Sequence, residues 1–473
     1  MCWCRLGDIG PPRRGQRRVG VPVTADEVTV RTGGRSRRVG WTRALTVGAA
    51  PGLESRLIRP DLGGYVDRDA YVAAGGYAEG GVRGEDLIEA VELAGLRGRG
   101  GAAFPTAVKM RSVRDRPGPR YLVANGEEGE PASVKDRWLL RHRPHLVLDG
   151  LLRTAEAVGV ERAYVFVSDR ACAAGVEHAL GELVAPAVPI EVVFVDPTYV
   201  AGEETAVVRA LEGGPALPLD KPPRPFEVGV KGQPTLIANV ETLANVPFVA
   251  VEGPKAYRQV GTSGSPGTFL LTISGDCRRP GLYEVPLGIV LRDALNMVGA
   301  PVSEACAILM GGFFGGILSP RVLDVPLAYD ELREEGSGLG CGSVIVLGAD
   351  DCPVAAVADV MNYFARENAN QCGACIRGTP AMRDAVMDLA RGTDDTERLR
   401  RWSLSLRGRG ACGLLDGAAA LAASLLREFP EVVQEHLDAR CARCADLIGP
   451  DTSERTRFRL PIDDPEENGE LVL

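Results

Sequence analysis

The sequence is short of aromatic residues, of histidine and of long apolar runs. Aromatic side chains make up 5% of its 473 residues, and only four residues are histidine. No apolar run approaches the roughly 18–20 residues that a membrane-spanning helix needs. The arginine-rich start also lacks the apolar core and small-residue cleavage site of a secretory signal. We therefore expect a cytoplasmic protein, either free or held at a membrane by partner subunits, with no direct membrane insertion.

What is present is the composition of an ordinary globular protein, 45% hydrophobic and 25% charged, which excludes a fibre, a coiled coil or wholesale disorder. The net charge of -9 is uneven, because residues 1–45 carry ten arginines against three acidic residues. A basic arm of this kind can bind nucleic acid or anionic lipid, but a disordered leader or a wrongly assigned start codon explains it equally. The acidic remainder argues against nucleic-acid binding. We predict a disordered basic leader over residues 1–50 and an extended acidic tail over residues 446–473.

Between these ends the sequence predicts three domains. Strand-like segments at 121–124, 163–167 and 190–195 alternate with helical segments, which is typical of an α/β domain with a parallel sheet, over residues 64–255. One of its helices begins at Gly84, where Leu87, Ile88, Val91 and Leu93 suggest one apolar face. Strands at 268–274 and 282–285 and a helix at 291–297 suggest a β-grasp module over residues 265–348. Helical periodicity over 354–365, 382–389, 418–426 and 431–437 predicts a bundle over residues 354–445.

A glycine-rich loop, Gly98-Arg-Gly-Gly101, opens a short helix in the first domain. Adjacent glycines let backbone N–H groups converge on an anion, and a helix N-terminus behind them adds its dipole. It is not a Rossmann fingerprint, because a helix and not a strand precedes it. Lys109, one to two helical turns further on, adds positive charge. A plain turn remains the alternative.

Three further motifs follow predicted strands. Asn125-Gly-Glu-Glu-Gly-Glu-Pro131 lies after the first strand, where open α/β sheets bind ligands, although a solvated acidic loop is an alternative. In Tyr199-Val-Ala-Gly-Glu-Glu-Thr205 the tyrosine can stack on a ring, while helix capping alone would explain the two glutamates. Asn239-Val-Glu-Thr-Leu243 supplies amide and hydroxyl groups before another helix and has the same alternative.

The cysteines form one dense group. Cys372-Gly-Ala-Cys375 is followed by Cys412, in a region with no nearby histidine, which favours an iron–sulfur cluster over a histidine-containing zinc site. Three ligands are one short of the usual four, and a second pair, Cys441 and Cys444, could complete a zinc site instead. Five others are interpreted as core residues: Cys172, Cys277, Cys306, Cys341 and Cys352.

Taken together, the motifs resemble one family. GLRGRGGAAFPTAVKM, NGEEGEP, YVAGEETAVVRALEG, PTLIANVETLANVP, CGACIRGTPAM and ACGLLDGAA occur in the order found in the NADH-binding flavoprotein subunit of respiratory complex I, the F subunit of NADH-quinone oxidoreductase. The same order occurs in related formate dehydrogenases and hydrogenases. The resemblance implies FMN and NADH in an α/β domain, a β-grasp (SLBB-like) insert and a helical domain with a 4Fe–4S cluster.

By resemblance, hydride passes from NADH to FMN, and single electrons then pass to the cluster or a protein acceptor, so no catalytic side chain is required. The partners implied are NADH and a redox protein, ferredoxin-like or a complex I-type subunit, in a hetero-oligomer. The implied cofactor-binding residues are Gly98, Arg99, Gly100, Gly101, Phe104, Lys109, Asn125, Glu127, Glu128, Glu130, Tyr199, Gly202, Glu203, Glu204, Asn239 and Thr242. The implied metal ligands are Cys372, Cys375 and Cys412.

The sequence departs from the family pattern at several of these places. Ala369 occupies the position of the first cluster cysteine, so a cluster with one iron lacking a thiolate, a three-iron cluster and no cluster at all are open alternatives. Smaller departures are Glu127 for an aspartate, Ala238 for an asparagine, Ser112 for an aromatic residue and Ala103 for a glycine. Two other functions therefore stay open: a non-catalytic scaffold stabilised by zinc through Cys372, Cys375, Cys412 and the Cys441/Cys444 pair, and an FMN reductase without a cluster.

Overall fold

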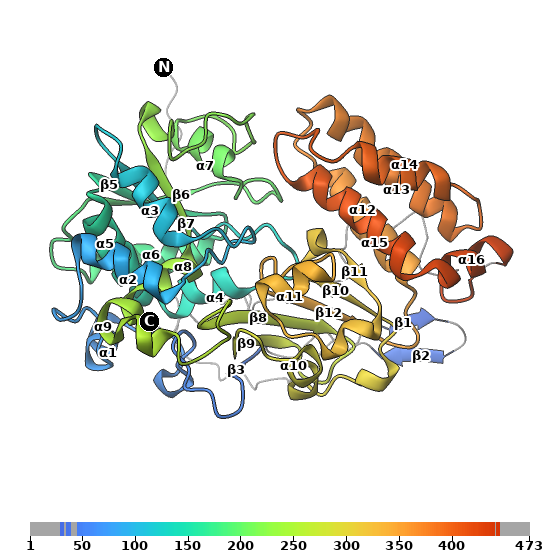
Figure 1. Ribbon diagram of the computed structural model, residues 1–473, viewed down its shortest axis with the longest axis horizontal. Coiled ribbons are helices and arrows are strands. Elements are labelled where there is room, and N and C mark those ends of the chain that lie inside the picture. Colours follow the sequence, from blue (N-terminus) through green and yellow to red (C-terminus); the bar gives the residue numbers. More distant parts are fainter. Residues whose placement is uncertain (1–28, 33–34, 39–44, 440, 445–473) are drawn as a thin grey trace, which may run out of the picture. The chain divides into compact units, whose positions relative to one another are not determined.

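The computed structural model describes residues 29–32, 35–38, 45–439 and 441–444 (Figure 1). The chain divides into two units, residues 1–43 and 44–473. In the first unit, strands β1 (Thr29–Thr32) and β2 (Arg35–Arg38) pair antiparallel. These strands lie inside the segment predicted to be a disordered leader, so that prediction is wrong for them. The rest of that segment up to residue 44 and the predicted tail at 446–473 lie outside the described residues.

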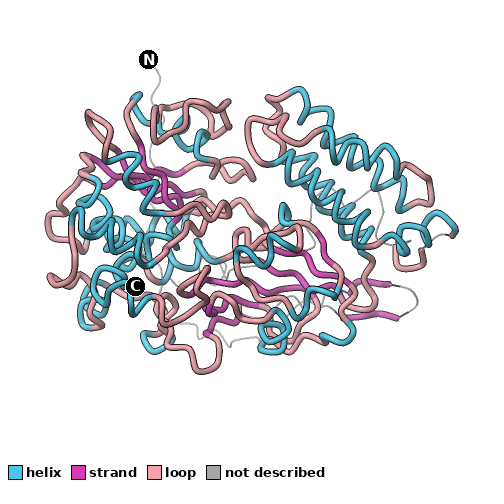
Figure 2. Tube along the Cα trace, in the orientation of Figure 1, coloured by secondary structure: helices cyan, strands magenta, loops and turns pink. Residues whose placement is uncertain are grey.

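A four-stranded parallel sheet forms the first part of the second unit, in the order β6-β5-β4-β7 (Figure 2). Its strands are β4 (Tyr121–Asn125), β5 (Arg162–Val167), β6 (Ile190–Phe194) and β7 (Thr235–Asn239). The helices around it are α1 (Arg68–Ala73), α2 (Gly84–Ala94), α3 (Thr106–Arg114), α4 (Lys135–His142), α5 (Pro144–Val158), α6 (Arg170–Gly181), α7 (Glu204–Leu211), α8 (Val240–Ala244) and α9 (Val246–Tyr257).

Both faces of this sheet are buried, which explains its nearly continuous apolar strands. Along β4, Leu122 and Ala124 join the large core formed with helices such as α2, α5 and α8, while Tyr121 and Val123 join a smaller core on the other face, beside α7. The predicted mixed α/β fold with a parallel sheet is therefore confirmed. The α2 helix is present, but its apolar face differs from the prediction: Leu93 is 58% exposed.

A second, six-stranded sheet has the order β11-β10-β12-β8-β9-β3 and mixes parallel with antiparallel pairs. Its strands are β3 (Thr46–Ala49), β8 (Thr268–Gly275), β9 (Gly281–Pro286), β10 (Ala307–Met310), β11 (Ile317–Leu318) and β12 (Ser343–Leu347), with helices α10 (Leu291–Met297) and α11 (Tyr329–Glu334). Strand β3 pairs with β9, so ordered structure begins before residue 50, where the leader was predicted to end. The sequence did not predict β3, because the strand has only four residues and a turn follows shortly after it.

Five helices follow: α12 (Pro353–Glu367), α13 (Gly373–Ala390), α14 (Thr396–Ser405), α15 (Leu414–Glu428) and α16 (Pro430–Asp438). They cover one face of the six-stranded sheet, because Ala307 and Leu309 of β10 join their core whereas Ile308 and Met310 face α10. Helix α14 was not predicted, since its sequence TERLRRWSLS buries only Leu399 and Ser403. No helix among the described residues is long and apolar enough to cross a membrane.

Candidate functional site

The predicted cofactor residues gather at the carboxyl edge of the parallel sheet. Asn125 ends β4 and Asn239 ends β7, and the two residues are direct partners in the parallel register. The Asn239 side chain caps α8 by accepting from the Glu241 N–H at 3.0 Å, and its amide donates to Asp136 at 2.7 Å. The Asn125 amide donates to the Gly202 carbonyl at 2.8 Å, which draws the Tyr199–Thr205 segment to the same edge.

The glycine-rich loop lies against this edge. A Cβ atom on Gly100 would stand 3.3 Å from the Cβ of Asn239, so the loop backbone passes directly over the end of β7. Within the described residues, the backbone N–H groups of Gly100, Gly101 and Ala102 have no hydrogen-bond acceptor. Three free donors before helix α3 form a cradle suited to a phosphate. The φ angle of Ala103 is +51°, a left-handed conformation that favours the glycine expected there.

Two loops meet beside the cradle. A Cβ atom on Gly202 would stand 2.4 Å from Oε2 of Glu127, so glycine is required where the Tyr199–Thr205 segment crosses that carboxyl group. The Tyr199 hydroxyl donates to Glu130 at 3.4 Å. Glu130 also accepts from the Phe313 N–H at 3.0 Å, which ties this loop to the six-stranded sheet region.

Two of the carboxyl groups titrate unusually. Burial raises the pKa of Glu127 to about 8 and the pKa of Glu130 to about 7. Glu127 accepts hydrogen bonds from the hydroxyl of Ser168, at 3.3 Å, and from the backbone N–H of Gly129. Buried carboxyl groups with perturbed pKa values are typical of functional sites.

Positive charge comes from Lys109 and Lys221. Lys109, on α3, lies 3.7 Å from Glu204, and burial lowers its pKa against the opposing effect of that glutamate. Lys221 lies 2.6 Å from Glu203, the N-cap of α7, whose carboxylate also accepts from the Thr205 N–H. Lys221 was not among the predicted residues. No local motif marks it, because it reaches the site from a proline-rich loop.

Three predicted residues have their side chains engaged elsewhere. The Arg99 guanidinium is buried and donates to the hydroxyls of Tyr257 (3.1 Å) and Tyr329, so this side chain is held by protein partners. Its N–H donates to the hydroxyl of Thr242 at 2.8 Å, which makes Thr242 a support of the loop. The Glu128 carboxylate caps α4 and pairs with Arg137 at 3.1 Å. Phe104 is 51% exposed.

The predicted metal ligands surround a separate hollow. Cys372, Cys375 and Cys412 line it together with Ala369 and Pro218. Cys372 is the N-cap of α13 and Cys412 lies just before α15, so two helix N-termini face the hollow and favour negative charge there. The Ala411 N–H donates to the Cys372 sulfur at 3.3 Å. Three sulfurs with a backbone donor fit an iron–sulfur cluster at three of its corners, and Ala369 offers only a methyl group at the fourth.

Other cysteines do not complete this set among the described residues. Cys441 and Cys444 lie beside Cys352, at the opposite end of α12, so a shared zinc site with Cys372, Cys375 and Cys412 is excluded by geometry. Cys352 is buried in the core, as expected, and it also lies next to Cys441 and Cys444. The hollow instead borders the cofactor edge. Pro218 lines it, and Lys221, three residues away and thus at most about 11 Å along the chain, pairs with Glu203.

An α/β edge with a cradle suited to a phosphate, next to a cysteine hollow, is typical of oxidoreductases that pair an organic redox cofactor with a metal cluster. Residues 91–248 match the family model described as the Nuo51 FMN-binding domain, and residues 355–436 match the NADH-ubiquinone oxidoreductase-F iron-sulfur binding region. The F 2 subunit of the NADH-quinone oxidoreductase of Rhizobium meliloti (strain 1021) is 34% identical over 400 residues, which cover 79% of this chain and 94% of that protein. The chain therefore belongs to the family of NADH-quinone oxidoreductase F subunits.

Further relatives agree. The NADH-quinone oxidoreductase F subunit of Aquifex aeolicus (strain VF5) is 33% identical over 368 residues, covering 73% of this chain and 85% of that protein. A solved structure, the NAD+-reducing NiFe hydrogenase in the H2-reduced state, superposes with a TM-score of 0.69 at 33% identity. That match covers 75% of this chain but only 62% of the hydrogenase chain. The prediction of an FMN-linked NADH dehydrogenase subunit with an iron–sulfur-binding region is confirmed at this level.

Proposed function

We propose that the carboxyl edge of the parallel sheet binds FMN and NADH and passes electrons from NADH to a cluster in the cysteine hollow. The observation that carries this proposal is the cradle of free N–H groups at Gly100–Ala102 beside the buried Glu127 and the half-buried Lys109. When bound, FMN accepts a hydride and releases its two electrons singly.

In this proposal the loop N–H groups and Lys109 bind the FMN phosphate, while Asn125 and Glu127 accept or donate hydrogen bonds to ribityl hydroxyls. Tyr199, Gly202 and Asn239 are proposed to contact FMN at the same edge, from two other segments. Glu130, Glu203 and Glu204, with the exposed ring of Phe104, are proposed to contact the dinucleotide. Arg99, Thr242 and Glu128 act through the backbone they hold in place, because their side chains already have partners.

We further propose that Cys372, Cys375 and Cys412 hold an iron–sulfur cluster with one corner that lacks a cysteine. We assign the six-stranded sheet to the β-grasp insert and helices α12–α16 to the cluster-bearing bundle. The domain limits 64–255, 265–348 and 354–445 are kept as proposals, with β3 added to the second domain. The relatives are named as subunits, which supports the proposal that this chain functions within a hetero-oligomer. The proposed electron acceptor is a ferredoxin-like or complex I-type subunit.

The test is an anaerobic titration of the purified chain with NADH, followed by absorbance and then by low-temperature EPR. Bleaching of a flavin band and an EPR signal after reduction are expected. A colourless preparation that takes up no added FMN would contradict the proposal. Bleaching without any EPR signal would instead favour the FMN reductase without a cluster, the candidate that Ala369 keeps open.

A matched pair of variants tests the phosphate site. Replacing Lys109 with glutamine removes a charge-assisted contact worth about 1.5–3 kcal/mol, so the FMN dissociation constant should rise roughly 10- to 100-fold. Lys255→Gln, on the exposed surface of α9, removes the same charge elsewhere and should leave FMN binding unchanged. Equal FMN affinity in the two variants would show that Lys109 does not face the phosphate.

A further inference from the structure

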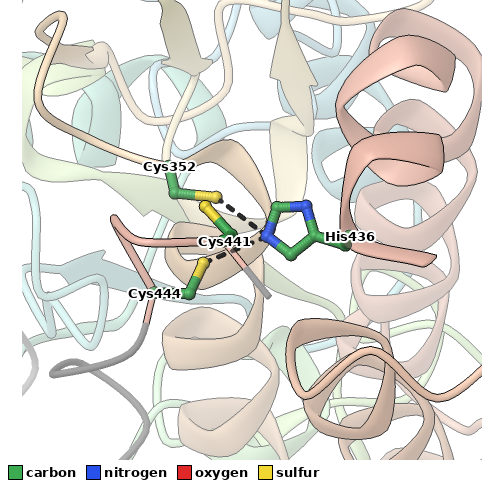
Figure 3. A group of neighbouring side chains, drawn as sticks. All are labelled: Cys352, His436, Cys441 and Cys444. Carbon is green, nitrogen blue, oxygen red and sulfur yellow. Dashed lines mark hydrogen bonds between the residues drawn. The ribbon is translucent and has the colours of Figure 1, made fainter. Parts of the chain in front are cut away.

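Four potential metal ligands meet where the first and last of the C-terminal helices come together (Figure 3). Cys352 is the N-cap of α12, His436 lies in the last turn of α16, and Cys441 and Cys444 follow that helix. One ligand atom from each lies within 4.8 Å of all the others. Cys352, His436 and Cys444 are 0–1% exposed, and Cys441 is half-buried. We call this group the Cys3His tetrad.

The histidine is oriented as a ligand. Its Nδ1 lies 2.7 Å from the carbonyl oxygen of Val432, and because a carbonyl can only accept, Nδ1 carries the proton. The other nitrogen, Nε2, therefore presents a lone pair, and it lies 3.4 Å from the sulfur of Cys352 and 3.1 Å from that of Cys444. In metal-bound histidines, the ring nitrogen that does not bind the metal commonly donates a hydrogen bond to a backbone carbonyl, and this hydrogen bond fixes the tautomer.

The size of the tetrad fits one ion. Sulfurs bound at about 2.3 Å to a tetrahedral zinc ion lie about 3.8 Å apart, and a nitrogen lies slightly closer. The atoms of the tetrad, all within 4.8 Å of one another, reach these separations with small side-chain rotations. An iron–sulfur cluster places several iron atoms between its ligands and needs a wider set.

The surrounding charge also fits. Zinc with three thiolates and a neutral imidazole carries a net charge of -1. Arg443 stands between two of the ligands in the chain, and its guanidinium donates to the carbonyl of Asp351, the residue before Cys352, at 3.4 Å. The same guanidinium lies 3.8 Å from the carboxylate of Glu435, so the cation beside the group is held from two sides. The helix N-terminus at Cys352 further favours a thiolate there.

We propose that Cys352, His436, Cys441 and Cys444 bind one zinc ion, separate from the proposed cluster. Four protein ligands leave no open position, which is the pattern of structural zinc and not of catalytic zinc. The ion would clamp α16 and the turn after it to the start of α12. Helix α12 has 15 residues and spans about 22 Å, so this site cannot supply the missing ligand at Ala369.

The test is metal analysis of the full chain, purified under reducing conditions from a medium that contains both zinc and iron. About one zinc per chain is expected, and Cys444→Ser should reduce it to roughly a tenth. Cys306→Ser is the matched control, because that thiol donates to Asp351, next to Cys352, but lies outside the tetrad. Cys372→Ser should lose iron and keep zinc.

A chain without zinc, zinc that persists in Cys444→Ser, or zinc that disappears in Cys372→Ser would each overturn the proposal. If Cys444→Ser does not fold, X-ray absorption of the unaltered chain decides instead. Three sulfurs at about 2.3 Å and one nitrogen at about 2.0 Å around zinc are expected, and a shell without three sulfurs would overturn the proposal. Flavin absorbance and iron, measured on the same samples, report on the proposed oxidoreductase function separately.

Discussion

The two ends of helix α12 carry two different arrangements of cysteine. At its start, Cys352 joins a compact tetrad with four ligand atoms, a fixed histidine and a neighbouring arginine. Beyond its end, Cys372, Cys375 and Cys412 surround a hollow with three sulfurs and the methyl group of Ala369. The tetrad offers four ligand atoms, whereas the hollow offers three sulfurs and is also lined by Pro218, three residues before Lys221.

The difference follows from what each site must do. A structural zinc ion is usually held by four ligands from the chain, and it can lie far from the chemistry. An electron-transfer cluster must lie near its electron donor, and three protein ligands hold it even if one corner is taken by another group. The predictions below test whether these two roles are correctly assigned.

The largest expected contrast is in thiol reactivity of the metal-free, folded chain. Burial raises the pKa of Cys375 to about 12, so its thiolate fraction, and its alkylation rate, should rise about tenfold per pH unit and about a thousandfold from pH 7 to pH 10. The hydrogen bond from Cys444 lowers the pKa of Cys352, so its alkylation rate should rise much less steeply with pH than that of Cys375.

The measurement is mass spectrometry of iodoacetamide-labelled peptides over time. Limited access lowers both rates but does not change with pH, so the slope is the informative quantity. Equal slopes for the two cysteines would remove the electrostatic distinction between the two ends of α12.

The next contrast is in stability. His436→Ala removes a zinc ligand and should lower the melting temperature by roughly 5–10 °C, because zinc binding is coupled to folding. Cys375→Ser, in the hollow, should lower it by only about 1–2 °C while abolishing the cluster iron. Differential scanning calorimetry measures both, with the exposed His178→Ala on α6 as control. A larger fall for Cys375→Ser would reverse the assignment of the structural site.

The same residues show which features of the two cysteine groups could be predicted from the sequence alone. The hollow was predictable because Cys372 and Cys375 share one helical turn and form a familiar spacing. The tetrad was not, because Cys352 and His436 are 84 residues apart and only packing of α16 against α12 joins them. The Cys441/Cys444 pair gave a signal, but the sequence did not identify Cys352 and His436 as its neighbours.

The cofactor edge shows the same limit. Its strands were predictable because buried parallel strands are continuous apolar runs, and the motifs after them meet at one edge by topology. The orientation of single side chains was not. Arg99 faces the hydroxyls of Tyr257 and Tyr329, which are distant in sequence and reach it only through the packing of the two sheets.

A smaller change, in iron content, is expected when a fourth cysteine is added to the hollow. Ala369→Cys places a thiol at the unfilled corner, so iron should rise from about three to about four per chain and the cluster should survive exposure to air. Iron and sulfide analysis with EPR measures this. Ile376→Cys adds an exposed thiol one residue after Cys375 and should change neither value. Unchanged iron in Ala369→Cys would mean that the corner is already filled or that no cluster forms.

The smallest effect concerns charge at the tetrad. Arg443→Gln removes the cation beside a zinc centre of net charge -1, so the zinc dissociation constant should rise by about 3- to 10-fold without loss of the metal during purification. Competition with a chromophoric chelator measures the constant, and Arg400→Gln on the surface of α14 controls for net charge. The hollow has no arginine among its lining residues and relies on the N-termini of α13 and α15. Neutralising Arg443 should therefore leave the iron content unchanged, and an equal loss of both metals would show that the two ends of α12 are not independent.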